Sequence, residues 1–380
     1  MVEWKKLGEI CDVFAGGDLP NHYIKTNKPT AEYQYPIYSN GIGEKSLYGY
    51  SDSYRVNETS ITISARGTIG YHTIRDPHFT PIVRLITLIP KKIDSVNLSY
   101  LNEVLYMTNI DGTKGGIPQL TVPVVSKITV PVPSLEEQNR IVGILDTFTT
   151  SIDNLKEQIA QRRKQYEYYR DQLFYASKAD LLEASKRGEA IVKSLDDLGT
   201  FTRGRRFVRT DIVPEGVPCI HYGDMYTYYG VSAEETPTHL TKELSSKLRF
   251  AKNGDVVIVA AEENDLDIGV GVAWLGKEPV VVHDACFIFE HEQNPQYLSH
   301  FMRSRNYHQQ IRMGVVDGKI CSISAKELGR ALIAVPSLQE QQRIVSILDT
   351  FEASIKNLET QLSQREKQYE YYRNKLLTFD

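Results

Sequence analysis

The chain has 380 residues, 41% of them hydrophobic and 24% charged, with a formal net charge of −4 at pH 7. This composition is typical of a folded protein and argues against global disorder. The negative charge excludes a protein that coats nucleic acid by charge alone, although a few placed side chains could still read bases. The length predicts two domains. Because no apolar run of about 18 residues and no signal-peptide core occurs, we expect a cytoplasmic protein.

The first block, residues 1–133, is predicted to be a mixed β/α domain. Strand-like runs occupy 60–65 and 83–90, and a helical pattern occupies 97–107. Arg66 follows the first strand and precedes two glycines, a setting in which a guanidinium can reach guanine or a phosphate. The alternative is an ordinary solvated arginine. Further candidate DNA contacts lie in the turn-rich loops of this block: Tyr38, Asn40, Lys45, Tyr48 and Lys114.

Residues 134–178 are predicted to form a long spacer helix and the start of a linker. Ser134 and Glu137 match a capping box, in which the serine caps the third amide and the glutamate returns to the serine amide. A strict heptad seam follows, which favours a coiled coil over a helix lying on its own domain. The seam residues are Ile141, Leu145, Phe148, Ile152, Leu155, Ile159, Arg162, Tyr166, Tyr169 and Leu173.

The second block, residues 179–334, contains a linker and then a second predicted mixed β/α domain. Strand-like runs occupy 254–261, 270–275 and 280–290, and a helix is expected near 295–311. A basic island in this otherwise acidic chain is typical of a phosphate clamp, with a solubilising surface as the alternative. The candidate DNA contacts are Arg203, Arg205, Arg206 and Arg209 in the island, His221, Tyr222, Asp224 and Tyr226 in the next loop, and Lys319 in a glycine turn.

Residues 335–380 are predicted to form a second spacer helix that repeats the first. Residues 132–174 and 335–377 align with a constant shift of 203 and are identical at 29 of 43 positions. The repeated seam is Ile344, Leu348, Phe351, Ile355, Leu358, Leu362, Arg365, Tyr369, Tyr372 and Leu376. Two equivalent halves related by a pseudo-twofold axis require an antiparallel pair within the chain. The fold class is therefore predicted to be α+β, with two mixed domains separated by an antiparallel coiled coil of about 48 Å at 1.5 Å per residue.

Catalytic and metal-binding signatures are missing from the sequence. No phosphate loop, nucleophile elbow, zinc-protease motif or dinucleotide fingerprint occurs. Cys11, Cys219, Cys286 and Cys321 are far apart and form no Cys-x-x-Cys pair, so we expect buried, reduced thiols and no metal. The chain is accordingly expected not to be an enzyme and to bind no cofactor of its own.

The duplicated helix start, PxPSLxEQxRIVxxLDxF at 131–148 and again at 334–351 with Ala334 at the first proline, resembles that of the specificity (S) subunits of type I restriction-modification systems. The resemblance covers the whole chain. It implies a non-catalytic protein that binds a bipartite double-stranded DNA target, one half-site per target-recognition domain. It also implies partners: two methyltransferase (M) subunits that bind S-adenosylmethionine and methylate adenine, and restriction (R) subunits. The second block has no arginine that matches Arg66.

A second reading comes from a different class: a coiled-coil adaptor whose terminal domains bind proteins. Basic islands beside tyrosine-rich loops favour the DNA-specificity subunit, and the negative net charge favours the adaptor.

Overall fold

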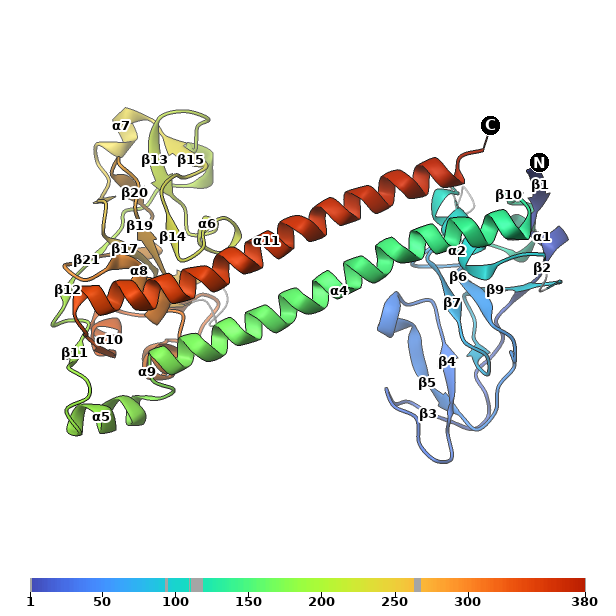
Figure 1. The fold of residues 1–380 in the computed structure, drawn as a ribbon, viewed down its shortest axis with the longest axis horizontal. Coiled ribbons are helices and arrows are strands. Elements are labelled where there is room, and N and C mark those ends of the chain that lie inside the picture. Colours follow the sequence, from blue (N-terminus) through green and yellow to red (C-terminus); the bar gives the residue numbers. More distant parts are fainter. Residues whose placement is uncertain (1, 93–94, 109, 111–118, 263–267, 380) are drawn as a thin grey trace. The chain divides into compact units, whose positions relative to one another are not determined.

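The computed structural model describes residues 2–92, 95–108, 110, 119–262 and 268–379. The chain forms two compact units, Met1–Lys156 with Gln361–Asp380, and Glu157–Thr360. Figure 1 shows the two long helices, α4 (Leu135–Leu173) and α11 (Leu338–Leu377), in green and red. Each unit therefore contains one globular domain together with one end of each long helix. The α+β fold class predicted from the sequence is confirmed.

The domain of the first unit is built on two four-stranded sheets. One sheet is antiparallel in the order β2-β9-β6-β7, and the other has the order β3-β5-β4-β8. Their strands are β2 (Cys11–Ala15), β9 (Leu85–Pro90), β6 (Ser60–Ser64), β7 (His72–Arg75), β3 (Tyr23–Ile24), β5 (Leu47–Ser51), β4 (Tyr35–Tyr38) and β8 (Thr80–Pro81). The remaining elements are β1 (Glu3–Lys6), which pairs with β10 (Thr129–Val132), and α1 (Leu7–Ile10), η1 (Gly43–Ser46), α2 (Leu98–Met107) and α3 (Val122–Ser126).

The domain of the second unit repeats this plan with additional strands. Its main sheet has the order β12-β21-β17-β19-β14 and its second sheet the order β15-β13-β20-β16. These strands are β12 (Gly199–Arg203), β21 (Cys286–His291), β17 (Val256–Val259), β19 (Gly271–Trp274), β14 (Ser232–Ala233), β15 (Thr238–Leu240), β13 (Val217–Ile220), β20 (Val280–Val282) and β16 (Phe250–Ala251). Two-stranded pairs join β11 (Val192–Ser194) to β23 (Leu332–Ala334) and β18 (Ala261–Glu262) to β22 (Cys321–Ser322). The helical elements are α5 (Lys178–Lys186), η2 (Arg209–Asp211), α6 (Asp224–Thr227), α7 (Lys242–Ser245), α8 (Pro295–Phe301), α9 (Arg305–Ile311), η4 (Arg312–Gly314) and α10 (Ala325–Gly329).

Two sequence predictions in the second domain are wrong in detail. The single strand expected over 280–290 is two strands in different sheets, β20 and β21, because the turn at His283 redirects the chain, with Cys286 N–H donating to His283 O. The single helix expected near 295–311 is α8 followed by α9. The second helix starts anew because the buried Ser304 side chain caps it, accepting a hydrogen bond from Tyr307 N–H.

The first turn of each long helix is joined to its own domain by hydrogen bonds. The Ser134 hydroxyl accepts a bond from Glu137 N–H at 3.3 Å, as predicted. The Glu137 carboxylate, however, bonds Arg140 through two 2.7 Å contacts, because an arginine one turn ahead offers it a charged fork. A glutamine that sequence analysis had not singled out, Gln138, is fully buried and accepts from Asn97 N–H at 2.8 Å. The helix residues of these contacts recur 203 residues later, starting at Ser337, and Asn294 takes the place of Asn97 as the partner of Gln341.

The long helices are antiparallel, as the pseudo-twofold relation between the two repeats predicted. In the first unit Phe148 stacks on Tyr372 with ring centroids 5.2 Å apart, and in the second unit Tyr169 stacks on Phe351 at 5.4 Å. These two contacts exchange under the shift of 203, which is the expected pseudo-twofold relation. Each seam contains one arginine, and each arginine lies over a ring of the opposite helix: Arg162 over Phe351 and Arg365 over Phe148.

The tyrosine-rich ends of the helices dock on the other domain rather than only closing the seam. Tyr166 donates to Glu352 at 3.0 Å and lies 3.1 Å from His300 Nδ1, while Tyr369 donates to Glu103 at 2.8 Å. Phe174, at the end of α4, is 2% exposed in the second unit's core, and Leu377, at the end of α11, is 6% exposed in the first unit's core. Each core is therefore completed by the helix that belongs to the other repeat.

Among the described residues, no helix is long and apolar enough to cross a membrane. All four cysteines are buried and unbonded, as predicted, and burial raises the pKa of Cys286 to about 12.

Candidate nucleic-acid interface

The two domains share one frame just beyond the carboxyl ends of β6 and β17, which are inner strands of their main sheets. In the first domain Ala65 N–H donates to Arg84 O at 2.8 Å, and Leu120 N–H donates to Ala65 O at 2.7 Å. In the second, Ala260 N–H donates to Ala285 O at 2.7 Å, and Ile323 N–H donates to Ala260 O at 2.9 Å. Ala65 and Ala260 are therefore equivalent positions. A hollow opens beside each, of about 390 Å³ in the first domain and about 470 Å³ in the second.

The hollow of the first domain carries two arginines. Arg66 lies two residues after the end of β6, and its backbone carbonyl accepts a bond from Asn40 Nδ2 at 2.6 Å, which fixes the loop. Within the described residues its guanidinium makes no hydrogen bond or ion pair, so it is available to a ligand. Arg84 is exposed on the same hollow, in the left-handed region at φ 80°. Sequence analysis missed Arg84, because only the tertiary turn against Ala65 brings it beside Arg66.

The other predicted DNA contacts of the first domain do not all lie beside Arg66. Tyr38 lies at the end of β4, two residues before Asn40, and Arg75 lies over its ring at 3.8 Å. Arg75 donates hydrogen bonds to Ser46 Oγ and Thr62 Oγ1, which fix its guanidinium against the ring. Lys45 is exposed in η1. Tyr48 packs instead against Tyr23, with ring centroids 6.0 Å apart. Lys114 lies outside the described residues.

The hollow of the second domain is lined by Arg203, Arg206 and Arg209. Arg203 is oriented by its Nε, which donates to Asp284 O at 2.7 Å. The predicted Arg205 points elsewhere, because its Nη1 donates to Lys247 O at 2.7 Å. Arg206 is exposed, and in the described part of the chain its guanidinium has no hydrogen-bond or ion-pair partner. The position equivalent to Arg66 is Ala261, so the two hollows carry their charge on different elements.

A cluster of aromatic rings forms the floor of this second hollow. The rings of His221, Tyr222 and His283 lie with centroids 4.5 to 5.2 Å apart, and Phe207 lies 5.0 Å from His283. His283 accepts at Nδ1 from Ala285 N–H, so its Nε2–H donates to Phe207 O at 3.0 Å. Sequence analysis missed His283, which lies in what was read as a strand.

Burial keeps both histidines neutral. It lowers the pKa of His283 below the ordinary value, against the opposing effect of Asp284. Burial likewise lowers the pKa of His221, with Asp224 opposing it. His221 accepts at Nδ1 from Gly223 N–H at 3.3 Å, which leaves Nε2–H as the donor edge of the ring. The aromatic and histidine rings of the floor are therefore uncharged and suited to stacking. The charged side chains that line the hollow are the three arginines and two carboxylates, Glu262 and Asp284.

The remaining predicted residues of the second domain lie around this hollow. The Asp224 carboxylate accepts from Thr238 Oγ1 at 3.2 Å, inside the domain rather than on the rim. Lys319 is exposed next to Ile320, which lines the hollow. The side chain of Tyr226 is outside the part of the chain that the structure describes.

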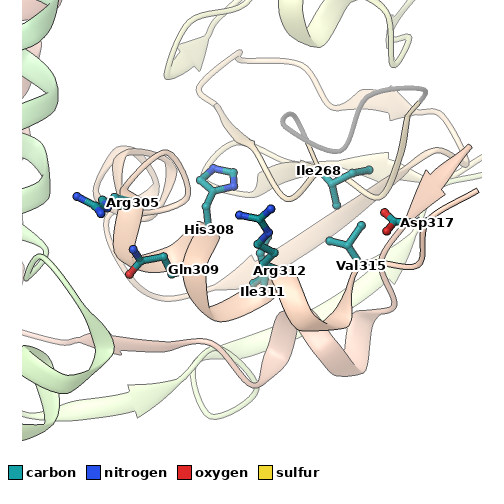
Figure 2. A pocket seen from close by; sticks show the side chains of 8 residues that line it. All are labelled: Ile268, Arg305, His308, Gln309, Ile311, Arg312, Val315 and Asp317. Carbon is teal, nitrogen blue, oxygen red and sulfur yellow. The ribbon is translucent and has the colours of Figure 1, made fainter.

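A third hollow, of about 490 Å³, lies at α9 and is shown in Figure 2. Arg305, His308 and Arg312 line one part of it, and Ile268 and Asp317 line another. Burial lowers the pKa of His308, with Arg170 as the next cause. Asp317 offsets part of the positive charge of this hollow.

Comparison with known proteins decides the family. The model of the type I restriction modification DNA specificity domain matches residues 1–162 and 189–366. The chain belongs to this family. It is 27% identical to the Escherichia coli type I restriction enzyme EcoR124I/EcoR124II specificity subunit, over 100% of this chain and 94% of that one. It is 28% identical to a putative specificity subunit of Haemophilus influenzae, over 100% and 96%.

Other relatives are matched over only part of their length or by structure. A putative type I specificity subunit of Mycoplasma pneumoniae is 36% identical over 45% of this chain, which spans about half (52%) of that protein. The crystal structure of a type I restriction-modification S subunit from M. genitalium matches with a TM-score of 0.59 at 16% identity, covering 100% of this chain and 97% of that one. This structural likeness supports the fold of the specificity family.

Proposed function

We propose that this chain is a DNA-specificity subunit that reads a bipartite target, one half-site in each domain. The observation that carries the proposal is the pair of equivalent hollows with unlike side chains. Arg66 projects in the first domain where Ala261 lies in the second, whereas the second domain places Arg206 and Arg209 over a neutral aromatic floor. A common frame with different readers is the arrangement needed to recognise two different half-sites.

The long helices are proposed to set the gap between the half-sites. Each is a continuous helix, of 39 residues in α4 and 40 in α11, and each contributes to the cores of both units. A helix resists bending far more than a loop, so the separation of the half-sites would follow helix length. Length changes in the linker 175–194 would change it further.

The chain itself is proposed to be non-catalytic and to act within a larger assembly. Two methyltransferase (M) subunits, which bind S-adenosylmethionine, would dock on it and methylate adenine, and restriction (R) subunits would join to cleave DNA. The net charge of −4 fits this arrangement, since such partners can supply much of the sequence-independent grip on the phosphates.

The test is a footprint of the chain bound with its own methyltransferase subunits on random duplex DNA. We expect two short protected patches separated by roughly one helical turn. Arg66→Ala should cost about 1 to 3 kcal/mol and relax one half-site only, while Arg206→Ala should lower the slope of binding against salt by about one. Arg187→Ala is the control, because that exposed arginine pairs with Glu189 away from both hollows. Equal affinity for all duplexes would refute the proposal and favour the protein-binding adaptor.

A further inference from the structure

The two long helices differ in charge where they flank the seam. Of the 43 aligned positions, 14 differ, and three of these lie seven residues apart in sequence. Lys156 of α4 corresponds to Glu359 of α11, Arg163 corresponds to Glu366, and Thr149 corresponds to Glu352. Side chains at this spacing lie along one edge of a coiled coil, where they meet the partner helix. The edge of α4 is therefore basic and that of α11 acidic.

Each unit contains one ion pair across these edges. In the first unit Lys156 Nζ lies 3.9 Å from a Glu366 carboxylate oxygen, and in the second Arg163 Nη2 lies 2.5 Å from Glu359. In both units the cation comes from α4 and the anion from α11. The third acidic position, Glu352, accepts from Tyr166 at 3.0 Å, while the threonine at its counterpart, Thr149, has no carboxylate to offer.

The apolar seam cannot by itself tell one helix from the other, because its residues are nearly identical in the two copies. The flanking charges can. If α4 paired in the same register with α4 of a second chain, Lys156 would face Arg163 twice. If α11 paired with another α11, Glu359 would face Glu366 twice. Like charges at these positions oppose pairing, and opposite charges favour it.

We propose that this charge division makes the helix interface selective: the basic edge of α4 takes the acidic edge of α11 and disfavours a second copy of α4. This selectivity acts in the assembly of the chain and is independent of what the domains bind. Its consequence is that the seam joins two unlike domains instead of forming a symmetric pair of like ones.

The full-length chain allows a direct test, because α11 can be given the edge of α4. The variant Glu359→Lys/Glu366→Arg places on α11 the residues that α4 carries at the equivalent positions. Both edges of the helix pair are then basic, so that like charges face each other. A second variant adds Lys156→Glu and Arg163→Glu, which exchanges the two edges and restores opposite charges. The control is Glu157→Lys/Glu370→Lys, which makes the same change in net charge at exposed positions with no described ion pair to the opposite helix.

The melting temperature is measured at about 20 mM and at about 1 M salt. At low salt we expect the like-charged variant to melt roughly 3 to 6 °C below wild type, the exchanged variant to return close to wild type, and the control to change little. At 1 M salt, where the screening length falls to about 3 Å, most of the difference should disappear. A like-charged variant that melts with wild type at low salt, or an exchanged variant that does not recover, would overturn the inference.

Discussion

Replacement of Gln138 by leucine is the sharpest test of how the long helix is joined to its domain. The side chain is 0% exposed and makes three hydrogen bonds: it accepts from Asn97 N–H at 2.8 Å and donates to Pro133 O at 2.9 Å and Ser95 O at 3.2 Å. Leucine has a similar volume but leaves all three partners without this bond. At about 0.5 to 1.5 kcal/mol for each bond, we expect a loss of roughly 2 to 4 kcal/mol in the first unit.

The readout must separate the two units, because a chain of several domains need not unfold in one step. Amide hydrogen exchange provides this separation, since it reports local opening free energies. Gln138→Leu should increase exchange in α2 and β10, whereas the matched variant Gln341→Leu, at the equivalent site beside Asn294, should act on α8 and β23. Asn139→Ala, at the next residue, loses one exposed contact and should have a small effect. Unchanged exchange in the first unit of the Gln138→Leu variant would refute the role of Gln138 in joining α4 to its domain.

Three further outcomes follow from other parts of the structure. Phe351→Asp places a carboxylate in the seam at the position where Phe351 stacks on Tyr169. In a binding assay on DNA with varied spacing between the half-sites, this variant should lose the preferred spacing while it still reads each half-site. An unchanged spacing preference would contradict the spacer role. Burial lowers the pKa of His291 to about 4, so the imidazole stays neutral in the folded chain, whereas in the unfolded chain it takes up a proton below about pH 6.5. The free energy of unfolding should therefore be at its full value above that pH and should fall by roughly 2 to 3 kcal/mol towards pH 4. Urea titrations across this range should show a flatter pH dependence for His291→Gln. Burial also raises the pKa of Cys286 to about 12, so a thiol reagent should leave it unmodified until the second unit unfolds, and rapid labelling at pH 8 would contradict this.

Much of the architecture could be predicted from the sequence, because it depends on local and periodic patterns. The heptad seams, the serine caps and the shift of 203 predicted two equivalent long helices and hence their antiparallel pairing. Buried strands such as β6 and β17 were visible as apolar runs. The same periodic signal could not reveal that Phe174 and Leu377 complete the core of the other repeat's domain, because a seam pattern carries no information about what lies beyond its end.

The candidate site shows the opposite balance. Local sequence patterns identified Arg66, which follows a predicted strand, and the cluster of arginines at 203–209. Only the tertiary structure placed Arg84 beside Arg66, turned Arg205 towards Lys247 and packed the ring of His283 against that of His221. These outcomes depend on contacts between residues tens of positions apart, formed when sheet edges and loops close on one another. Sequence patterns record which chemistry is available, and the closing of the fold decides which of those side chains meet.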